Sequence, residues 1–134
     1  MSELLRKLGT KAEARSIVIE APAEVRKAVS PPGSAKRLAG TFDYIHVFVR
    51  DQKGLKSGLV RLKPRLRKGG TLWVSWPKGG GQGTDLSLPK VIEIGYRKGL
   101  VESKAISIDA VWSALKFTFP KEGKVYNNSF GKLP

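Results

Sequence analysis

Cysteine is absent from this chain of 134 residues, and histidine occurs once, as His46. Without thiols the chain can form neither a disulfide nor a thiolate metal site, and it has no cysteine nucleophile. A single imidazole cannot build a histidine metal site. The sequence therefore predicts no bound metal.

Long apolar runs are also missing. No segment approaches the roughly 18 apolar residues of a membrane-spanning helix, and the first 15 residues have no run of signal-peptide length. We therefore expect a cytoplasmic protein. Because 40% of the residues are apolar, including three Trp, we also expect a folded core. The predicted single domain covers residues 1–119, and the polar residues 120–134 are predicted to form a tail.

Acidic residues are scarce: 11 Asp and Glu stand against 25 Lys and Arg, for a net charge of +14. Such a charge attracts polyanions whatever the fold. The spacing of Leu55, Leu59, Leu62 and Leu66 predicts a helix over residues 52–68, with a kink or a second short helix opening at Pro64. Its other faces form a candidate nucleic-acid surface of Lys53, Lys56, Arg61, Lys63, Arg65, Arg67 and Lys68. No helix-turn-helix, zinc-finger or RNA-stacking signature accompanies it, so a solvated helix face is the simpler interpretation.

Alternating strand and helix signals predict the architecture. Helices are expected over residues 2–8, 23–29, 52–68 and about 85–98, and strands over 16–20, 42–50, 71–76, 100–109 and 113–119. The nearly continuous apolar run in 42–50 is typical of a central strand, and the short link between the last two strands favours an antiparallel hairpin. This order predicts a three-layer, Rossmann-like α/β sandwich with a mostly parallel sheet and antiparallel C-terminal edge strands.

A glycine-rich loop between a strand and a helix is the first candidate ligand site. Backbone N–H groups in such a loop, helped by a lysine and a helix N-terminus, can hold a phosphate or carboxylate. The spacing is not that of a Walker A loop, and a flexible surface loop with capping residues is the alternative. The candidate anion-binding residues are Lys78, Gly79, Gly80, Gly81, Gly83, Thr84 and Asp85.

A second candidate cluster surrounds the turn into the last strand and comprises Trp76, Asp109, Trp112, Ser113 and Lys116. Asp109 and Lys116 could pair, whereas Ser113 becomes a nucleophile only beside a base. His46 lies inside a predicted buried strand, which favours a packing role over catalysis. The sequence thus predicts no catalytic residue, and this favours a protein that is not an enzyme.

The fragments LWVSWPK, TD and DAVWSALKF resemble an uncharacterised bacterial domain family of unknown function, over roughly residues 1–119. That resemblance implies a fold but no activity. More distantly, FDYIHVF, a helix, LRKGGTLWV and a terminal strand pair are similar to the second half of class I S-adenosylmethionine-dependent methyltransferases. The latter resemblance implies a reduced methyltransferase-like topology.

The turn after the first strand departs from the pattern of those enzymes. Residues 20–24 contain no glycine, Pro22 removes an N–H donor, and Glu20 and Glu24 add negative charge. Residues 35–40, where a second strand and its acidic residue belong, are short and basic. We therefore expect a degenerate site with no cofactor.

Three functions are compatible with these observations. The first is a non-catalytic, methyltransferase-like scaffold that binds a ligand or a partner. The second is nucleic-acid binding through residues 53–68. The third is a small enzyme, or a methyltransferase with a divergent site. The predicted partner is a polyanion or another protein, and the oligomeric state stays open.

Overall fold

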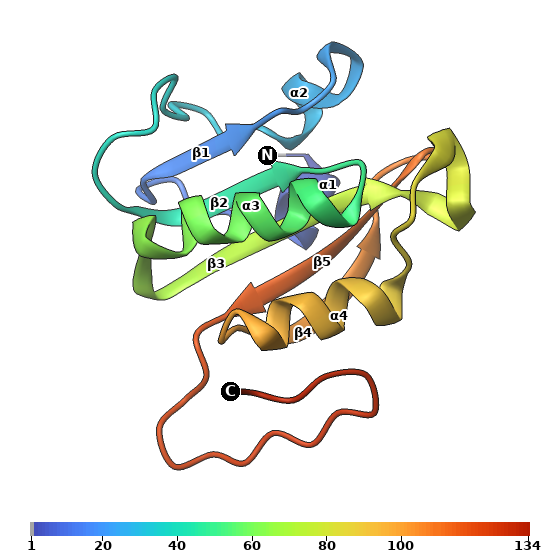
Figure 1. Ribbon diagram of the computed structural model, residues 1–134. Coiled ribbons are helices and arrows are strands. Elements are labelled where there is room, and N and C mark those ends of the chain that lie inside the picture. The colour runs from blue at the N-terminus through green and yellow to red at the C-terminus, as the bar shows by residue number, and fades with distance from the viewer. Residues whose placement is uncertain (1) are drawn as a thin grey trace.

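The computed structural model describes residues 2–134, so Met1 of the expected domain lies outside it. Figure 1 shows a single sheet with helices packed against it. The elements, in chain order, are α1 (Glu3–Lys7), β1 (Ser16–Ile19), α2 (Ala23–Val29), β2 (Phe42–Phe48), α3 (Gln52–Leu62), η1 (Lys63–Arg65), β3 (Leu66–Pro77), η2 (Lys78–Gly83), α4 (Leu88–Arg97), β4 (Val101–Ser107) and β5 (Trp112–Thr118). No helix among these has the length and apolar content needed to cross a membrane.

The five strands follow the order β1-β2-β3-β5-β4. β1, β2 and β3 are parallel, whereas β5 runs antiparallel to both β3 and β4. The fold is therefore mixed α/β, with a parallel N-terminal side and an antiparallel C-terminal hairpin, as the sequence predicted. The outermost strands are β1 and β4.

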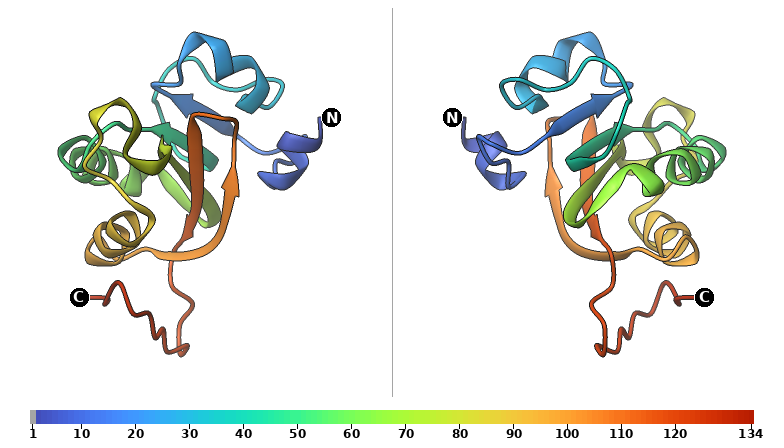
Figure 2. Two further views of the ribbon diagram at one scale, coloured as in Figure 1. Left: turned by 90° about the vertical axis from the view of Figure 1, so that its right-hand side faces the viewer. Right: turned by 90° about the vertical axis from the view of Figure 1, so that its left-hand side faces the viewer.

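Two hydrophobic clusters are built by alternate residues of the same strands. Ile45 and Val47 of β2 belong to a cluster with α3 and α4, whereas Tyr44 and Phe48 belong to one with α1 and α2. Since neighbouring side chains of a strand point to opposite faces, the two helix pairs cover different faces of the sheet. Figure 2 shows α3 and α4 on one side and α1 and α2 on the other.

The helix predicted over 52–68 ends at Leu62, the second short helix expected at Pro64 is present, and the prediction is wrong from Leu66 on. Pro64 lacks an N–H and its ring disfavours the preceding helical turn, so the chain forms the short 3-10 turn η1 and β3 begins at Leu66. Leu66 is buried, as the leucine stripe predicted, but it lies in a strand and pairs with Phe42 of β2. The strand expected over 71–76 therefore begins at residue 66.

The C-terminal residues 120–134 contain neither helix nor strand and run past α4 (Figure 1), yet their residues contact α4 and the edge strand β4. Asn128 Nδ2 donates to Glu102 Oε1 at 2.8 Å, and Tyr96 Oη donates to the same oxygen at 2.7 Å. At Gly131 a Cβ atom would lie 2.9 Å from the Tyr96 side chain. The tail thus packs against the domain, and the boundary at residue 119 stays a prediction.

Candidate functional site

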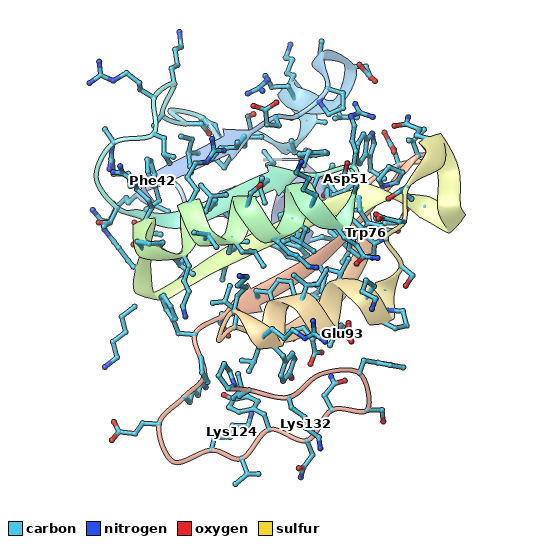
Figure 3. The ribbon with its side chains drawn as sticks, in the orientation of Figure 1. Phe42, Asp51, Trp76, Glu93, Lys124 and Lys132 are labelled. Atoms are coloured by element: carbon cyan, nitrogen blue, oxygen red, sulfur yellow. The ribbon has the colours of Figure 1, made fainter. Side chains whose placement is uncertain are left out.

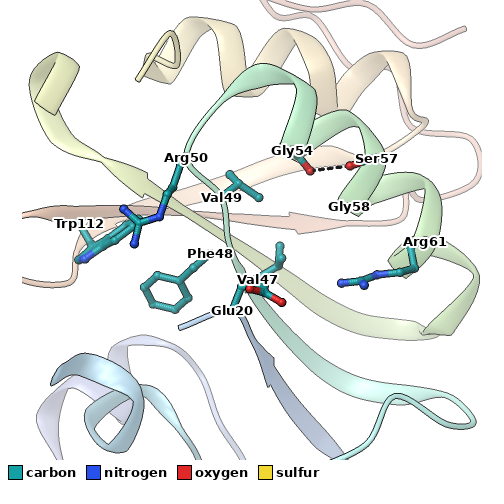
Figure 4. Close-up of a pocket in the computed structure, with 10 residues that line it drawn as sticks. All are labelled: Glu20, Val47, Phe48, Val49, Arg50, Gly54, Ser57, Gly58, Arg61 and Trp112. Carbon is teal, nitrogen blue, oxygen red and sulfur yellow. Dashed lines mark hydrogen bonds between the residues drawn. The ribbon is translucent and has the colours of Figure 1, made fainter. Parts of the chain in front are cut away.

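A pocket of about 550 Å³ opens where β1 and β2 end (Figure 4). Its lining comes from the turn after β1, the end of β2, one face of α3 and the start of β5. The ten residues are Glu20, Val47, Phe48, Val49, Arg50, Gly54, Ser57, Gly58, Arg61 and Trp112. Open α/β sheets usually bind ligands at the carboxyl ends of their strands, and this pocket has that position.

The pocket exists because three small residues lie on one face of α3. These are Gly54, Ser57 and Gly58, and Arg61 follows them in the same stripe, at the spacing i, i+3, i+4 and i+7. A Cβ added at Gly58 would meet no atom within 4 Å. β1 is the outermost strand of the sheet, and beyond it, in the described chain, Ala35 forms only an isolated bridge to Ile17.

Two guanidinium groups and one carboxylate line the pocket. The Arg50 guanidinium lies 5.2 Å from the Trp112 ring centroid and donates to Gln82 Oε1. Among residues 2–134, the side chains of Arg61 and Glu20 make no hydrogen bond or ion pair. Figure 4 shows the Arg61 side chain extending from α3 toward the Glu20 carboxylate. Arg50 is thus held in place, while Arg61 keeps all its donors for a ligand.

The turn that carries Glu20 is the one that departs from the methyltransferase pattern. Glu20 has φ +60°, a left-handed conformation that costs a non-glycine residue about 1 kcal/mol or more. Pro22 occupies the N-cap of α2 and makes no side-chain cap. Arg26 donates to the carbonyl oxygens of Val18 and Ala21, both at 3.3 Å. The turn therefore offers the pocket a carboxylate in place of a glycine-rich set of N–H donors.

The predicted glycine-rich loop forms η2 and the segment before α4. Lys78 donates to Ser107 Oγ, and the Thr84 hydroxyl accepts from Leu86 N at 3.1 Å. Asp85 Oδ1 accepts from Gln52 N at 2.8 Å, which fastens the loop to the start of α3. The exposed glycines of the loop are Gly79, Gly80, Gly81 and Gly83. The Arg50–Gln82 bond joins this loop to the pocket.

The predicted cluster at the turn into β5 does not form one group, because its two tryptophans lie on opposite faces of the sheet. Trp76 packs with α3 and α4, whereas Trp112 packs with α1 and α2. Asp109 Oδ1 accepts from the backbone N–H of Val111 and Trp112, both at 2.8 Å. Lys116 Nζ lies 6.0 Å from the Trp73 ring centroid, and Ser113 pairs with Trp76 in the sheet. In residues 2–134 Asp109 and Lys116, which the sequence allowed to pair, form no ion pair.

The basic stretch divides into two regions because the helix ends at Leu62. Lys53, Lys56 and Arg61 lie on α3 and are exposed. Lys63 Nζ donates to the carbonyl of Lys98 at 2.6 Å, at the end of α4. The remaining residues, Arg65, Arg67 and Lys68, lie in η1 and at the start of β3. The basic residues predicted on a helix over 53–68 therefore lie on α3, on η1 and on β3.

His46 is fully buried in β2, as the sequence predicted. Its Nε2 lies 2.7 Å from Ser75 Oγ and its Nδ1 lies 3.3 Å from Tyr44 Oη. Burial lowers the pKa of His46 to about 3, so the ring is neutral at pH 7. Ser75 and His46 have the spacing of a nucleophile and its base, but neither side chain is exposed, so no substrate can reach them.

Comparison with known proteins gives little further information. No protein-family model matches the chain, and no curated protein matches it. A solved structure similar to this one is the ribosomal protein L11 methylase of Lactobacillus delbrueckii subsp. bulgaricus, with 16% identity and a TM-score of 0.49. The match covers 79% of this chain but spans only 59% of the methylase. This similarity carries no argument about activity, and membership of the bacterial domain family stays a prediction.

Proposed function

We propose that this chain is a cytoplasmic, non-catalytic domain with a reduced methyltransferase-like, three-layer scaffold, which binds a small organic anion in the pocket beside α3. The unpartnered guanidinium of Arg61, extending into a pocket at the carboxyl edge of the sheet, carries this proposal. Guanidinium groups bind carboxylates and phosphates through paired, charge-assisted hydrogen bonds. Arg50 supplies a second positive charge at the end near Trp112.

The rest of the pocket favours a ligand with an apolar body. Val47, Phe48 and Trp112 contribute to the lining, and the volume of about 550 Å³ lies in the usual range for small-molecule sites. The proposed ligand places its anionic group at Arg61 and its apolar part against Phe48 and Trp112. The glycine-rich loop of residues 78–85 flanks the site through the Arg50–Gln82 bond.

Two observations support binding without catalysis. The hydroxyl that lines the pocket, Ser57 Oγ, donates to the Gly54 carbonyl at 3.3 Å and has no imidazole beside it, since His46 is buried elsewhere. The turn at Glu20 and Pro22 presents a carboxylate and a proline where S-adenosylmethionine would need backbone donors. We therefore propose that the pocket rejects this cofactor.

Phenyl phosphate is a suitable probe because it joins one anionic group to one aromatic ring. In a titration followed by ¹H–¹⁵N spectra, the amides of Gly54 and Gly58 are expected to shift with a saturable dissociation constant. Arg61→Gln should weaken binding about tenfold or more, since a hydrogen bond to a charged group contributes about 1.5–3 kcal/mol.

Lys53→Gln is the matched control because it removes the same charge from the same helix outside the pocket lining. It should change the dissociation constant less than about twofold. An equal loss in both variants would mean that phenyl phosphate is attracted only by net charge, and the proposal would fail. Calorimetry with S-adenosylmethionine should give no heat of binding, and saturable micromolar binding would overturn the non-catalytic assignment.

A further inference from the structure

Two loops lie side by side at the end of the sheet opposite the pocket. One is the loop that joins α2 to β2, and the other consists of η1 and the first residues of β3; both lie at the edge where the parallel strands begin (Figure 1). Figure 3 labels Phe42 at this end and Asp51 and Trp76 at the other. Arg65 Nη1 donates to the Gly40 carbonyl at 3.1 Å, and Arg67 Nε donates to Thr41 Oγ1 at 3.0 Å. These bonds bring the two basic loops together.

We name the cations gathered there the amino-edge patch: Arg15, Lys36, Arg37, Arg65, Arg67 and Lys68. The acidic side chain bonded to this patch is Asp43, whose Oδ2 accepts from Arg15 N at 2.9 Å and from Arg67 Nη1 at 3.0 Å. Lys11 and Glu13 lie beside Asp43 around a neighbouring hollow and offset each other's charge. The patch therefore keeps a large positive excess.

Three arginines of the patch, Arg15, Arg65 and Arg67, are held in place before any partner arrives. Arg15 donates to the carbonyls of Thr41 and Ala39 at 2.8 and 2.7 Å, and its guanidinium lies 4.3 Å from the Phe42 ring centroid. Each guanidinium has five N–H donors, so donors remain after these bonds. Fixed donors lose less conformational entropy on binding than free side chains do.

Three other cations of the patch are exposed and free. Among residues 2–134, the side chains of Lys36, Arg37 and Lys68 make no hydrogen bond or ion pair. None of the large hydrophobic side chains that are exposed in the described chain belongs to these loops. A membrane-surface or protein contact would draw on such side chains, whereas a phosphodiester backbone requires only spaced cations and N–H donors.

We propose that the amino-edge patch docks the phosphate backbone of a nucleic acid, independently of the ligand pocket. The patch suits this partner better than α3 does. Lys53 and Lys56 lie on a helix whose start is flanked by Asp51 and Asp85, which offset their charge. The patch instead joins cations from three separate segments of the chain, so it can contact several successive phosphates.

The test measures fluorescence anisotropy of a labelled 20-nucleotide DNA, single-stranded and as a duplex, across a series of salt concentrations. The triple variant Lys36→Gln/Arg37→Gln/Lys68→Gln leaves the bonded Arg15, Arg65 and Arg67 unchanged, and circular dichroism verifies its fold. It should reduce the slope of log K against log salt by about two to three and weaken binding at low salt more than tenfold.

Lys53→Gln/Lys56→Gln/Lys121→Gln is the control, because it removes the same net charge from exposed positions outside the patch. Its affinity should stay within about threefold of the unmodified protein. Equal losses in the two triple variants would overturn the proposal, since binding would then follow net charge alone. The proposal would also be overturned if the unmodified protein bound neither the single-stranded nor the duplex DNA at about 50 mM salt.

Discussion

Lowering the pH from 7 to 5 should destabilise this protein through His46 alone by about 2 kcal/mol. Burial lowers the pKa of the imidazole from 6.5 to about 3 in the native state, whereas in the unfolded chain it keeps its ordinary value. Below pH 6.5 the unfolded chain therefore binds a proton that the native protein does not. The contribution of the neutral ring to stability is complete above pH 6.5 and is lost as the pH falls toward 3, at up to about 1.4 kcal/mol per pH unit.

The surroundings of His46 leave no compensating charge. Its ring contacts Tyr44, Ser75, Phe48 and Trp73, none of which is a carboxylate that would stabilise an imidazolium. Urea unfolding at pH 7, 6 and 5 measures the effect, with His46→Leu/Ser75→Ala as the reference. This variant removes both partners of the 2.7 Å hydrogen bond.

The reference variant leaves the Tyr44 hydroxyl without its imidazole partner, which lowers stability by a similar amount at every pH. That offset cancels when the change between pH 7 and 5 is compared. The unmodified protein should lose about 2 kcal/mol more than the variant over this interval. Equal losses would refute the reasoning, because His46 would then titrate alike in the native and unfolded states.

Three smaller perturbations test the strain, packing and electrostatics of the fold. Glu20→Gly should raise the free energy of unfolding by about 0.5 kcal/mol, because glycine adopts φ +60° without strain, whereas Glu20→Gln should give no such gain in thermal unfolding. Gly95→Ala should lower the free energy of unfolding by about 1–3 kcal/mol, since the added Cβ would overlap Phe117 Cε1. Adding Phe117→Leu should restore part of the lost melting temperature. Asp43→Asn should cost about 0.5–1 kcal/mol through the half-exposed ion pair with Arg67, and chemical unfolding should show a smaller cost at 0.5 M than at 0.05 M salt.

The helices and strands were predictable where local signals agree with one another. Ala23–Val29 begins at the break Ala21-Pro22 and ends before Pro31-Pro32, and the structure has those limits. The boundary between α3 and β3 could not be predicted in this way, because Leu66 fits the leucine stripe of a helix and also the buried face of a strand. Only the pairing of Leu66 with Phe42, which lies far away in the sequence, decides between the two.

The pocket could be predicted only in part. The spacing of Gly54, Ser57, Gly58 and Arg61 along one helix face is a local signal for an open groove, and our sequence interpretation did not use it. Glu20 joins that groove through the parallel pairing of β1 with β2, a long-range contact without a local signature. For the same reason Ser75 was missed as the partner of His46, since their contact depends on the register of β2 with β3.

The decisive experiment for the pocket is a crystal structure of the protein with phenyl phosphate. We expect the phosphate oxygens to lie within hydrogen-bond distance of the Arg61 guanidinium and the phenyl ring to pack against Phe48 or Trp112. Phosphate held by the loop of residues 78–85 alone, or an empty pocket at a concentration that saturates the spectral titration, would contradict it.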